Sequence, residues 1–143
     1  SLDKVKFLYV GRISPEKGIF DFINFFQKLV IESSLSIAGN HKNYSPPNNT
    51  IKLLGYISKP KDLMDAYDDH NITILPSYTE GYPYVIDESL SRRRPVIIFE
   101  EISYVLNNKK GIFISKRDQK SFEETVNFIV KNYEKIQQDI ANI

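Results

Sequence analysis

The chain has 143 residues, 41% of them hydrophobic and 13% aromatic, which is enough to build one globular domain over residues 1–143 with its own core. Nineteen basic and eighteen acidic residues leave a net charge of +1, which argues against nucleic acid held by bulk charge. With no cysteine, disulfides and thiolate metal sites are excluded, and the chain opens without a signal-peptide pattern. We therefore expect a cytoplasmic protein. Its longest apolar runs are far below the roughly 20 residues that span a bilayer.

Short apolar runs alternate along the chain with segments of helical period. Strands are predicted at Val5–Val10, Leu35–Ala38, Ile51–Leu54, Ile72–Leu75, Pro95–Phe99 and Gly111–Ile114. Helices are predicted at Ile19–Val30, at Pro60–Asp69, over about ten residues from Tyr84, and as one long amphipathic helix from Ser121 to Ile140. This alternation predicts a Rossmann-like three-layer α/β sandwich with a mostly parallel sheet of about six strands.

In such sheets ligands bind beyond the carboxyl ends of the strands, and the first candidate segment there is Gly11–Gly18. Its opening glycine allows a sharp turn, and the following Ser-Pro pair can start a helix whose free amide groups favour an anion. Arg12 and Lys17 add two positive charges. The combination suits a phosphate or diphosphate, although two loop cations taken alone also fit an ordinary solvated role.

The second candidate segment is Pro76–Glu88, which carries Glu80 and Glu88 with seven residues between them. Ionised carboxylates only accept hydrogen bonds, so they suit the hydroxyl groups of sugars and repel phosphate. Each glutamate taken alone also fits an ordinary role, as a favourable charge near a helix start or as a surface residue. Cations for phosphate and carboxylates for hydroxyls, at one edge of one sheet, together describe a site for a nucleotide sugar.

Several short motifs occur along the chain in a defined order, and the combination is specific where a single motif would not be. They are Gly11-Arg12, Glu16-Lys17-Gly18, Ile37-Ala38-Gly39, Leu53-Leu54-Gly55-Tyr56-Ile57, Pro76-Ser77, Glu80-Gly81-Tyr82-Pro83, Glu88 and Pro95-Val96-Ile97. Through them the chain resembles, from Phe7 to about Ile114, the C-terminal donor-binding domain of the family 4 (group 1) glycosyltransferases, which have the GT-B fold.

The resemblance implies a role for each matching residue. Arg12 and Lys17 would bind the donor diphosphate and stabilise its charge as it leaves, which makes them the main electrostatic catalysts. Glu80 would hold hydroxyl groups of the donor sugar, and Glu88 the ribose. The remaining implied donor contacts are Gly11, the loop Gly81, Tyr82 and Pro83, and, for the base, Tyr56 and Ile57. Enzymes of this family retain the anomeric configuration and need neither a metal nor another cofactor.

Two stretches depart from the family pattern. The helix that carries the second glutamate usually ends in glycine, whereas here Arg93 follows Ser89 and Ser91. Because arginine in a left-handed helix-end conformation costs about 1 kcal/mol more than glycine, we expect this helix to end differently. The segment between Ile97 and Gly111 is short and lacks the paired glycines that are common in the family. These departures leave the donor sugar and the shape of its pocket open.

The resemblance also implies a missing partner, because a GT-B active site lies between two domains and the N-terminal acceptor domain has no counterpart here. We therefore expect the chain to bind a nucleoside-diphosphate sugar but not to transfer it efficiently alone. The alternatives are a non-catalytic regulatory nucleotide-binding module and a degenerate transferase domain.

Two charged clusters lie outside the candidate site, and each has more than one possible role. The run 92–94 of three arginines fits cations at a helix C-terminus, and the alternative is peripheral docking of the intact enzyme to anionic lipid at the inner membrane face. Asp68-Asp69-His70 resembles a metal cluster, but adjacent residues of a helix point in different directions, so no metal site is predicted.

Overall fold

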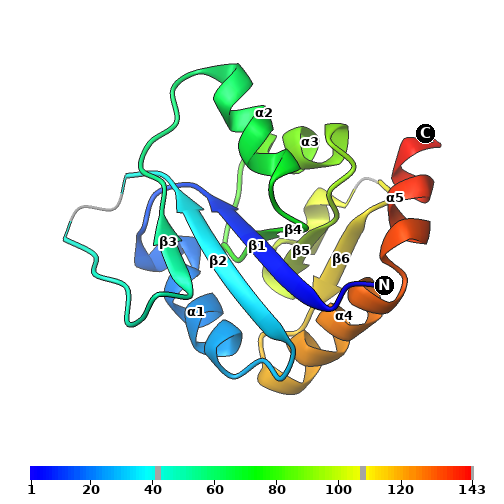
Figure 1. The fold of residues 1–143 in the computed structure, drawn as a ribbon, viewed down its shortest axis with the longest axis horizontal. Coiled ribbons are helices and arrows are strands. Elements are labelled where there is room, and N and C mark those ends of the chain that lie inside the picture. The colour runs from blue at the N-terminus through cyan, green and yellow to red at the C-terminus, as the bar shows by residue number, and fades with distance from the viewer. Residues whose placement is uncertain (41–42, 107–108, 143) are drawn as a thin grey trace.

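The structure is a computed structural model that describes residues 1–40, 43–106 and 109–142. Within them, strands of one parallel sheet follow the spatial order β3-β2-β1-β4-β5-β6 (Figure 1). The strands are β1 (Lys4–Val10), β2 (Glu32–Ala38), β3 (Ile51–Leu53), β4 (Ile72–Leu75), β5 (Val96–Phe99) and β6 (Ile112–Ser115). The helices are α1 (Ile19–Gln27), α2 (Pro60–Asp68), α3 (Tyr84–Ser91), α4 (Gln119–Lys131) and α5 (Tyr133–Ala141), with short 3-10 helices η1 (Pro15–Lys17) and η2 (Glu100–Val105). The predicted Rossmann-like sandwich is confirmed.

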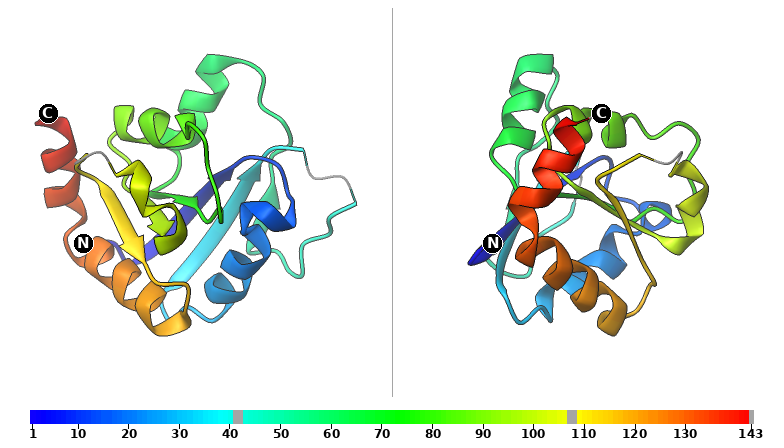
Figure 2. Two further views of the ribbon diagram at one scale, coloured as in Figure 1. Left: turned by 180° about the vertical axis from the view of Figure 1, so that it is seen from behind. Right: turned by 90° about the vertical axis from the view of Figure 1, so that its right-hand side faces the viewer.

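Alternation along β1 sorts its side chains between the two faces of the sheet. Phe7 and Tyr9 are buried against α1 and α4, where Phe7 meets the rings of Phe22 and Phe122 at 5.5 and 6.2 Å. Leu8 faces the other way and packs with Tyr67 of α2. Helices α1 and α4 thus lie on one face, and α2 and α3 on the other (Figure 2). The central strand is buried on both faces, as expected in a parallel sheet.

The chain reverses its direction of travel across the sheet between β1 and β4. From β1 it moves outward through β2 to β3, then returns to β4 and continues to β6. The carboxyl ends of β1 and β4 therefore diverge into loops that run to opposite sides, which opens a crevice at that edge. Both candidate segments leave strands that border this switch point.

The connection from β2 to β3 contains no helix in its described part, residues 39–40 and 43–50. Ser34 and Ser36 of β2 are consequently only half-buried, and they line a shallow groove with the exposed Lys6 and Lys52 on neighbouring strands. One face of this outer part of the sheet thus carries polar side chains and reaches solvent.

Two predicted boundaries were wrong. Helix α1 ends at Gln27, and Val30 is 91% exposed, because β2 begins at Glu32 and pairs with β1 along its full length from Lys4. The predicted long C-terminal helix is divided at Asn132, whose side-chain amide donates to the carbonyl of Phe128 (2.8 Å). The apolar stripe survives the break, because all of its members are buried: Phe122, Val126, Ile129, Val130, Tyr133, Ile136 and Ile140. The tail packs on the body of the chain.

The expectation that α3 would end without a left-handed residue was also wrong. Arg93 has φ 60°, and its amide donates to the carbonyl of Leu90, while the amide of Arg94 donates to that of Ser89. This pair of bonds is the Schellman ending that glycine usually makes. The turn into β5 requires a positive φ at this position, and Arg93 adopts it at a cost in backbone strain.

The neighbours of Arg93 bind the end of α2. Arg92 makes two bonds to the Asp68 carboxylate (2.9 and 2.6 Å), which hold the pKa of that carboxyl below its usual range. Arg94 donates to the carbonyls of His70 (3.0 Å) and Asp68 (2.6 Å). Two of the three arginines are therefore cations at a helix C-terminus, as the sequence favoured, although the helix is α2. No helix in the described ranges is both long and apolar enough to cross a membrane.

Replacing Arg93 by glycine should raise the free energy of unfolding by about 1 kcal/mol, because glycine adopts a positive φ without strain. Chemical denaturation measures the change. The matched control is Arg93→Ala, which also removes the guanidinium but keeps the Cβ and should give no such gain. Equal stabilisation by both variants would mean that the side-chain charge, and not the backbone, is responsible.

Candidate functional site

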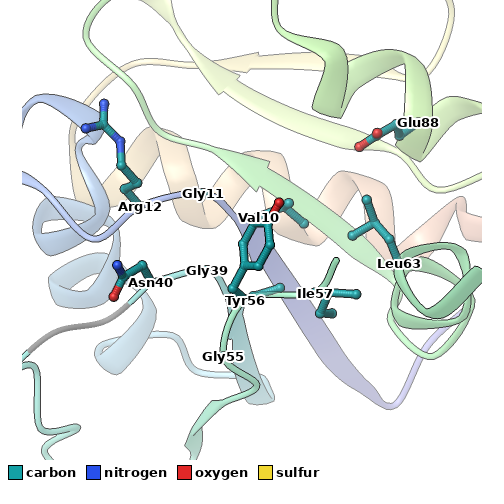
Figure 3. Close-up of a pocket in the computed structure, with 11 residues that line it drawn as sticks. Val10, Gly11, Arg12, Gly39, Asn40, Gly55, Tyr56, Ile57, Leu63 and Glu88 are labelled. Atoms are coloured by element: carbon teal, nitrogen blue, oxygen red, sulfur yellow. The ribbon is translucent and has the colours of Figure 1, made fainter. Parts of the chain in front are cut away.

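A hollow of about 740 Å³ opens at the carboxyl ends of β1, β2 and β3 (Figure 3). Its lining comes from the loop after each strand and from two helices: Val10, Gly11, Arg12, Ala38, Gly39, Asn40, Gly55, Tyr56, Ile57, Leu63 and Glu88. The loops after β1 and β2 approach each other closely at Gly39. A Cβ there would stand 1.9 Å from the carbonyl oxygen of Gly11, so only glycine fits. Five of the predicted donor contacts face this one space.

A second hollow of about 200 Å³ shares Val10 and Gly11 with the first and extends toward β4. Among its lining residues are Lys17, Glu80, Tyr82 and Pro83. The two hollows together contain nine of the ten predicted site residues. Gly81, the tenth, lines a separate small hollow beside Tyr82 and Pro83.

The loops that carry Lys17 and Glu80 are joined through their backbones. Gly18 has φ 68°, and a Cβ there would stand 2.0 Å from the carbonyl oxygen of Pro76. The amide of Tyr78 also donates to the carbonyl of Glu16 (3.3 Å). Two loops about sixty residues apart in sequence are thereby held against each other, and the sequence motifs alone do not show this long-range contact.

Glu80 is the most tightly held of the predicted residues. One of its carboxylate oxygens, Oε2, accepts from the ammonium group of Lys17 (3.2 Å) and from the hydroxyl of Ser77 (2.7 Å). The side chains of Lys17 and Glu80 are 28% and 10% exposed, so solvent screens the pair only partly. The main chain of Glu80 is bonded to Tyr104, whose hydroxyl accepts from its amide (2.9 Å) and donates to its carbonyl (2.7 Å).

Glu88 stands on α3 and points into the larger hollow (Figure 3). Its Oε1 accepts from the hydroxyl of Tyr67 (2.8 Å), a side chain of α2 that is fully buried. Burial, with the neighbouring carboxylate second, raises the pKa of the Tyr67 phenol, so it remains a donor at any physiological pH. The other carboxylate oxygen of Glu88 is the one available for a ligand.

Arg12 rises from the rim beside Gly11, and its side chain is exposed (Figure 3). Its carbonyl accepts from the buried Tyr9 hydroxyl (2.6 Å), whose pKa is raised by burial, so the bond persists over the physiological range. Tyr56 is 79% exposed, and its ring stands at the mouth of the hollow. The main chain of Arg12 is thus held in place while its guanidinium is exposed, which suits a side chain that binds a ligand from solution.

Three residues that hold the predicted glutamates were not predicted from the sequence. Tyr67 lies in the predicted helix Pro60–Asp69 without an assigned role, Ser77 was part of a motif without a role, and Tyr104 lies in the stretch that departs from the family pattern. Of these, only Tyr67 carried a signal in the sequence: a buried tyrosine hydroxyl usually has a hydrogen-bond partner, so a tyrosine on a buried helix face indicates a polar partner in the core.

The Asp68-Asp69-His70 cluster has structural roles. Asp68 is paired with Arg92, and His70 is buried with its Nδ1 2.6 Å from the carbonyl of Ala66. Burial lowers the pKa of His70, so the ring is neutral and donates this bond. No group of three or more metal-binding side chains converges among the residues that the structure describes.

The sheet order and the switch point define a doubly wound α/β protein, and the adjoining hollows form a candidate ligand site at the reversal of strand order. The model of the family "Glycosyl transferases group 1" matches residues 1–142, and the chain belongs to this family. The resemblance inferred from the motifs is confirmed.

Two curated relatives are described as glycosyltransferases of capsular polysaccharide or teichuronic acid biosynthesis. The capsular polysaccharide biosynthesis glycosyltransferase CapM of Staphylococcus aureus is 26% identical over 94% of this chain. The putative teichuronic acid biosynthesis glycosyltransferase TuaC of Bacillus subtilis is 28% identical over 87% of it. The chain spans 38% and 33% of the length of these relatives.

Solved structures share the fold at low identity. HepE of Anabaena, solved in complex with UDP and glucose, superposes with a TM-score of 0.76 at 15% identity, over 98% of this chain and 42% of HepE. The C-terminal domain of the group 1 family protein LpcC from Francisella tularensis gives 0.71 at 15% identity, over 96% of this chain and 80% of that structure. The fold is that of GT-B glycosyltransferases.

Replacing Tyr67 by phenylalanine should lower the free energy of unfolding by about 1 kcal/mol, because the half-buried Glu88 carboxylate loses a donor from the core. Urea denaturation measures the loss. Tyr56→Phe is the matched control: it also removes a phenolic hydroxyl, but from an exposed ring at the hollow that Glu88 lines, and should leave stability unchanged. An unaltered midpoint for Tyr67→Phe would show that the bond contributes nothing to the fold.

Proposed function

We propose that the chain is the donor-binding part of a glycosyltransferase and that it binds a nucleoside-diphosphate sugar across its two hollows. The observation that carries this proposal is the contact between Lys17 and Glu80 in the smaller hollow, which adjoins the larger one at Val10 and Gly11. A cation for phosphate and a carboxylate for hydroxyl groups touch each other there. The bond between the diphosphate and the sugar would lie over this pair.

The cationic side of the site is assigned to the diphosphate. Arg12 precedes η1 and Lys17 is the last residue of η1, and Gly11 leaves the main chain open beside them. Two positive charges near the leaving oxygen would stabilise the charge that develops as the glycosidic bond breaks. The proposed transfer is metal-independent and retains the anomeric configuration, with these side chains in place of a divalent cation.

The two carboxylates are assigned to hydroxyl groups at opposite ends of the diphosphate. Glu80 would accept bonds from the sugar, beside the loop Gly81, Tyr82 and Pro83. Glu88 would accept bonds from the ribose, since it shares the larger hollow with Tyr56 and Ile57, which we assign to the base. The complexes of HepE with UDP and with UDP-glucose support a nucleotide-sugar ligand for this fold.

The acceptor is assigned to a part of the enzyme outside this chain. The chain spans 38% and 33% of its curated relatives, and the crevice at the switch point opens to one side without a facing domain among the residues described. We therefore expect binding of the donor but no efficient transfer by these 143 residues. The relatives point to glycoconjugate or polysaccharide synthesis as the setting.

Calorimetric titration with the diphosphates of uridine, adenosine and guanosine, and with their glucose conjugates, tests the donor site. Arg12→Ala should weaken binding of the preferred diphosphate about tenfold or more, because it removes a charge-assisted contact. Lys28→Ala removes another exposed cation, at the far end of α1, and should bind like wild type. If no diphosphate binds at millimolar concentration, the proposal fails. Equal binding by Arg12→Ala would exclude Arg12 from the site and favour a degenerate module.

Glu80→Gln should separate the two halves of the donor. The amide can still accept from Ser77, but it releases Lys17 and removes a negative charge, so a diphosphate alone should bind up to about fivefold tighter. The conjugated sugar should lose its advantage over the diphosphate. Glu88→Gln is the contrast, because it breaks a ribose contact without freeing Lys17 and should weaken both ligands. Looser binding of the bare diphosphate by Glu80→Gln would refute the assignment of Lys17.

A further inference from the structure

The loop that carries Glu80 is held by two side chains that do not line either donor hollow. Arg117 follows β6 and Tyr104 belongs to η2, and both lie outside every motif that identifies the family. We propose that they are positioning residues, which fix Glu80 for the sugar end of the donor by holding the turn Ser77–Glu80 from behind. The inference deepens the proposed function and rests on it.

Arg117 is a buried guanidinium at the centre of several segments. Its side chain is only 12% exposed and stacks on the ring of Tyr78 at 3.9 Å and on that of Phe99 at 4.5 Å. Two of its nitrogens bind the carboxylate of Glu101 at 2.9 and 3.1 Å. Nη2 also donates to the carbonyl of Ser77 (3.3 Å). The planar fork thus connects η2 to the turn that precedes Glu80.

The same guanidinium reaches the loop that carries Lys17. Its Nη1 lies 3.1 Å from where a Cβ on Gly18 would stand and 3.9 Å from a carboxylate oxygen of Asp21. Asp21 in turn accepts a hydrogen bond from the hydroxyl of Tyr78. Nη1 is buried and makes no hydrogen bond to the described residues. Arg117 therefore touches both loops whose separation sets the contact between Lys17 and Glu80.

Tyr104 holds Glu80 itself. Its hydroxyl accepts from the Glu80 amide and donates to the Glu80 carbonyl, at 2.9 and 2.7 Å. The phenol thus occupies both main-chain groups of one residue, which restricts rotation of the peptide planes on either side of it. A phenylalanine would keep the ring and lose both bonds.

The position of Glu80 matters because its carboxylate is proposed to bind three partners. It bonds to Lys17 and Ser77 before a donor arrives, and it must also reach sugar hydroxyl groups. Displacement of a binding group by a fraction of an ångström to one ångström degrades such a site. Two contacts on the main chain, at Ser77 and at Glu80, keep the turn in place while the side chain exchanges partners.

The test combines amide hydrogen exchange with ligand binding in Tyr104→Phe and Arg117→Gln. The matched control is Arg92→Gln, which breaks another two-bond arginine–carboxylate pair, at the α2–α3 end. We expect exchange at the Glu80 amide to accelerate at least about tenfold in the first two variants and not in the control. Thermal unfolding verifies that each variant is folded, and Tyr104→Phe decides the matter alone if Arg117→Gln is not.

Binding is measured with the diphosphate that wild type prefers among those of uridine, adenosine and guanosine, and with its glucose conjugate. The affinity advantage of the conjugate should fall about threefold to tenfold in both variants, while the bare diphosphate changes less than about twofold. A protected Glu80 amide in both variants, or an unchanged advantage, overturns the inference. If wild type binds no diphosphate, the proposed function fails instead, and the exchange data still decide whether Arg117 and Tyr104 hold Glu80.

Discussion

The contact of Gly18 with the carbonyl of Pro76 is the constraint on which the site depends. It brings the loop after β1 against the loop after β4, at the point where the chain changes direction across the sheet. Lys17 and Glu80, the neighbours of this contact, can then meet at 3.2 Å. A side chain larger than hydrogen at position 18 would separate the loops and leave a cation and a carboxylate on opposite walls of a wider crevice.

The sequence predicted most of the fold, because buried parallel strands are continuous apolar runs and amphipathic helices have a clear period. The errors occurred where tertiary contacts outweigh local pattern. Val30 fits the helical period of α1, but full-length pairing of β2 with β1 needs the chain extended by Glu32. Asn132 interrupts a stripe whose spacing continues on both sides, and Arg93 adopts a conformation that its type disfavours because the turn into β5 demands it.

The candidate site was predictable to the extent that it is written in local motifs. Arg12, Lys17, Glu80 and Glu88 each lie in a short, ordered signature, and the structure gathers them around adjoining hollows. Their supports were not predictable, because Tyr67 contacts Glu88 across 21 residues and Arg117 contacts Ser77 across 40. Such contacts depend on which helices pack together, and no short pattern in the chain specifies that.

The connection between β2 and β3 contains no helix in its described part, so the two faces of β2 are anchored unequally. Strand β2 packs into the core beside α1 through Leu35 and Ile37, while Ser34 and Ser36 line a groove on the other side that reaches solvent. A strand secured from one face opens locally at a lower free energy than one buried on both. The end of the larger hollow that we propose for the base, at Tyr56 and Ile57, lies beside this outer half, whereas Glu80 follows β4, a fully buried strand at the centre of the sheet. The rigid end of the crevice is therefore where bond-breaking is proposed, and the adaptable end is where one base would be told from another.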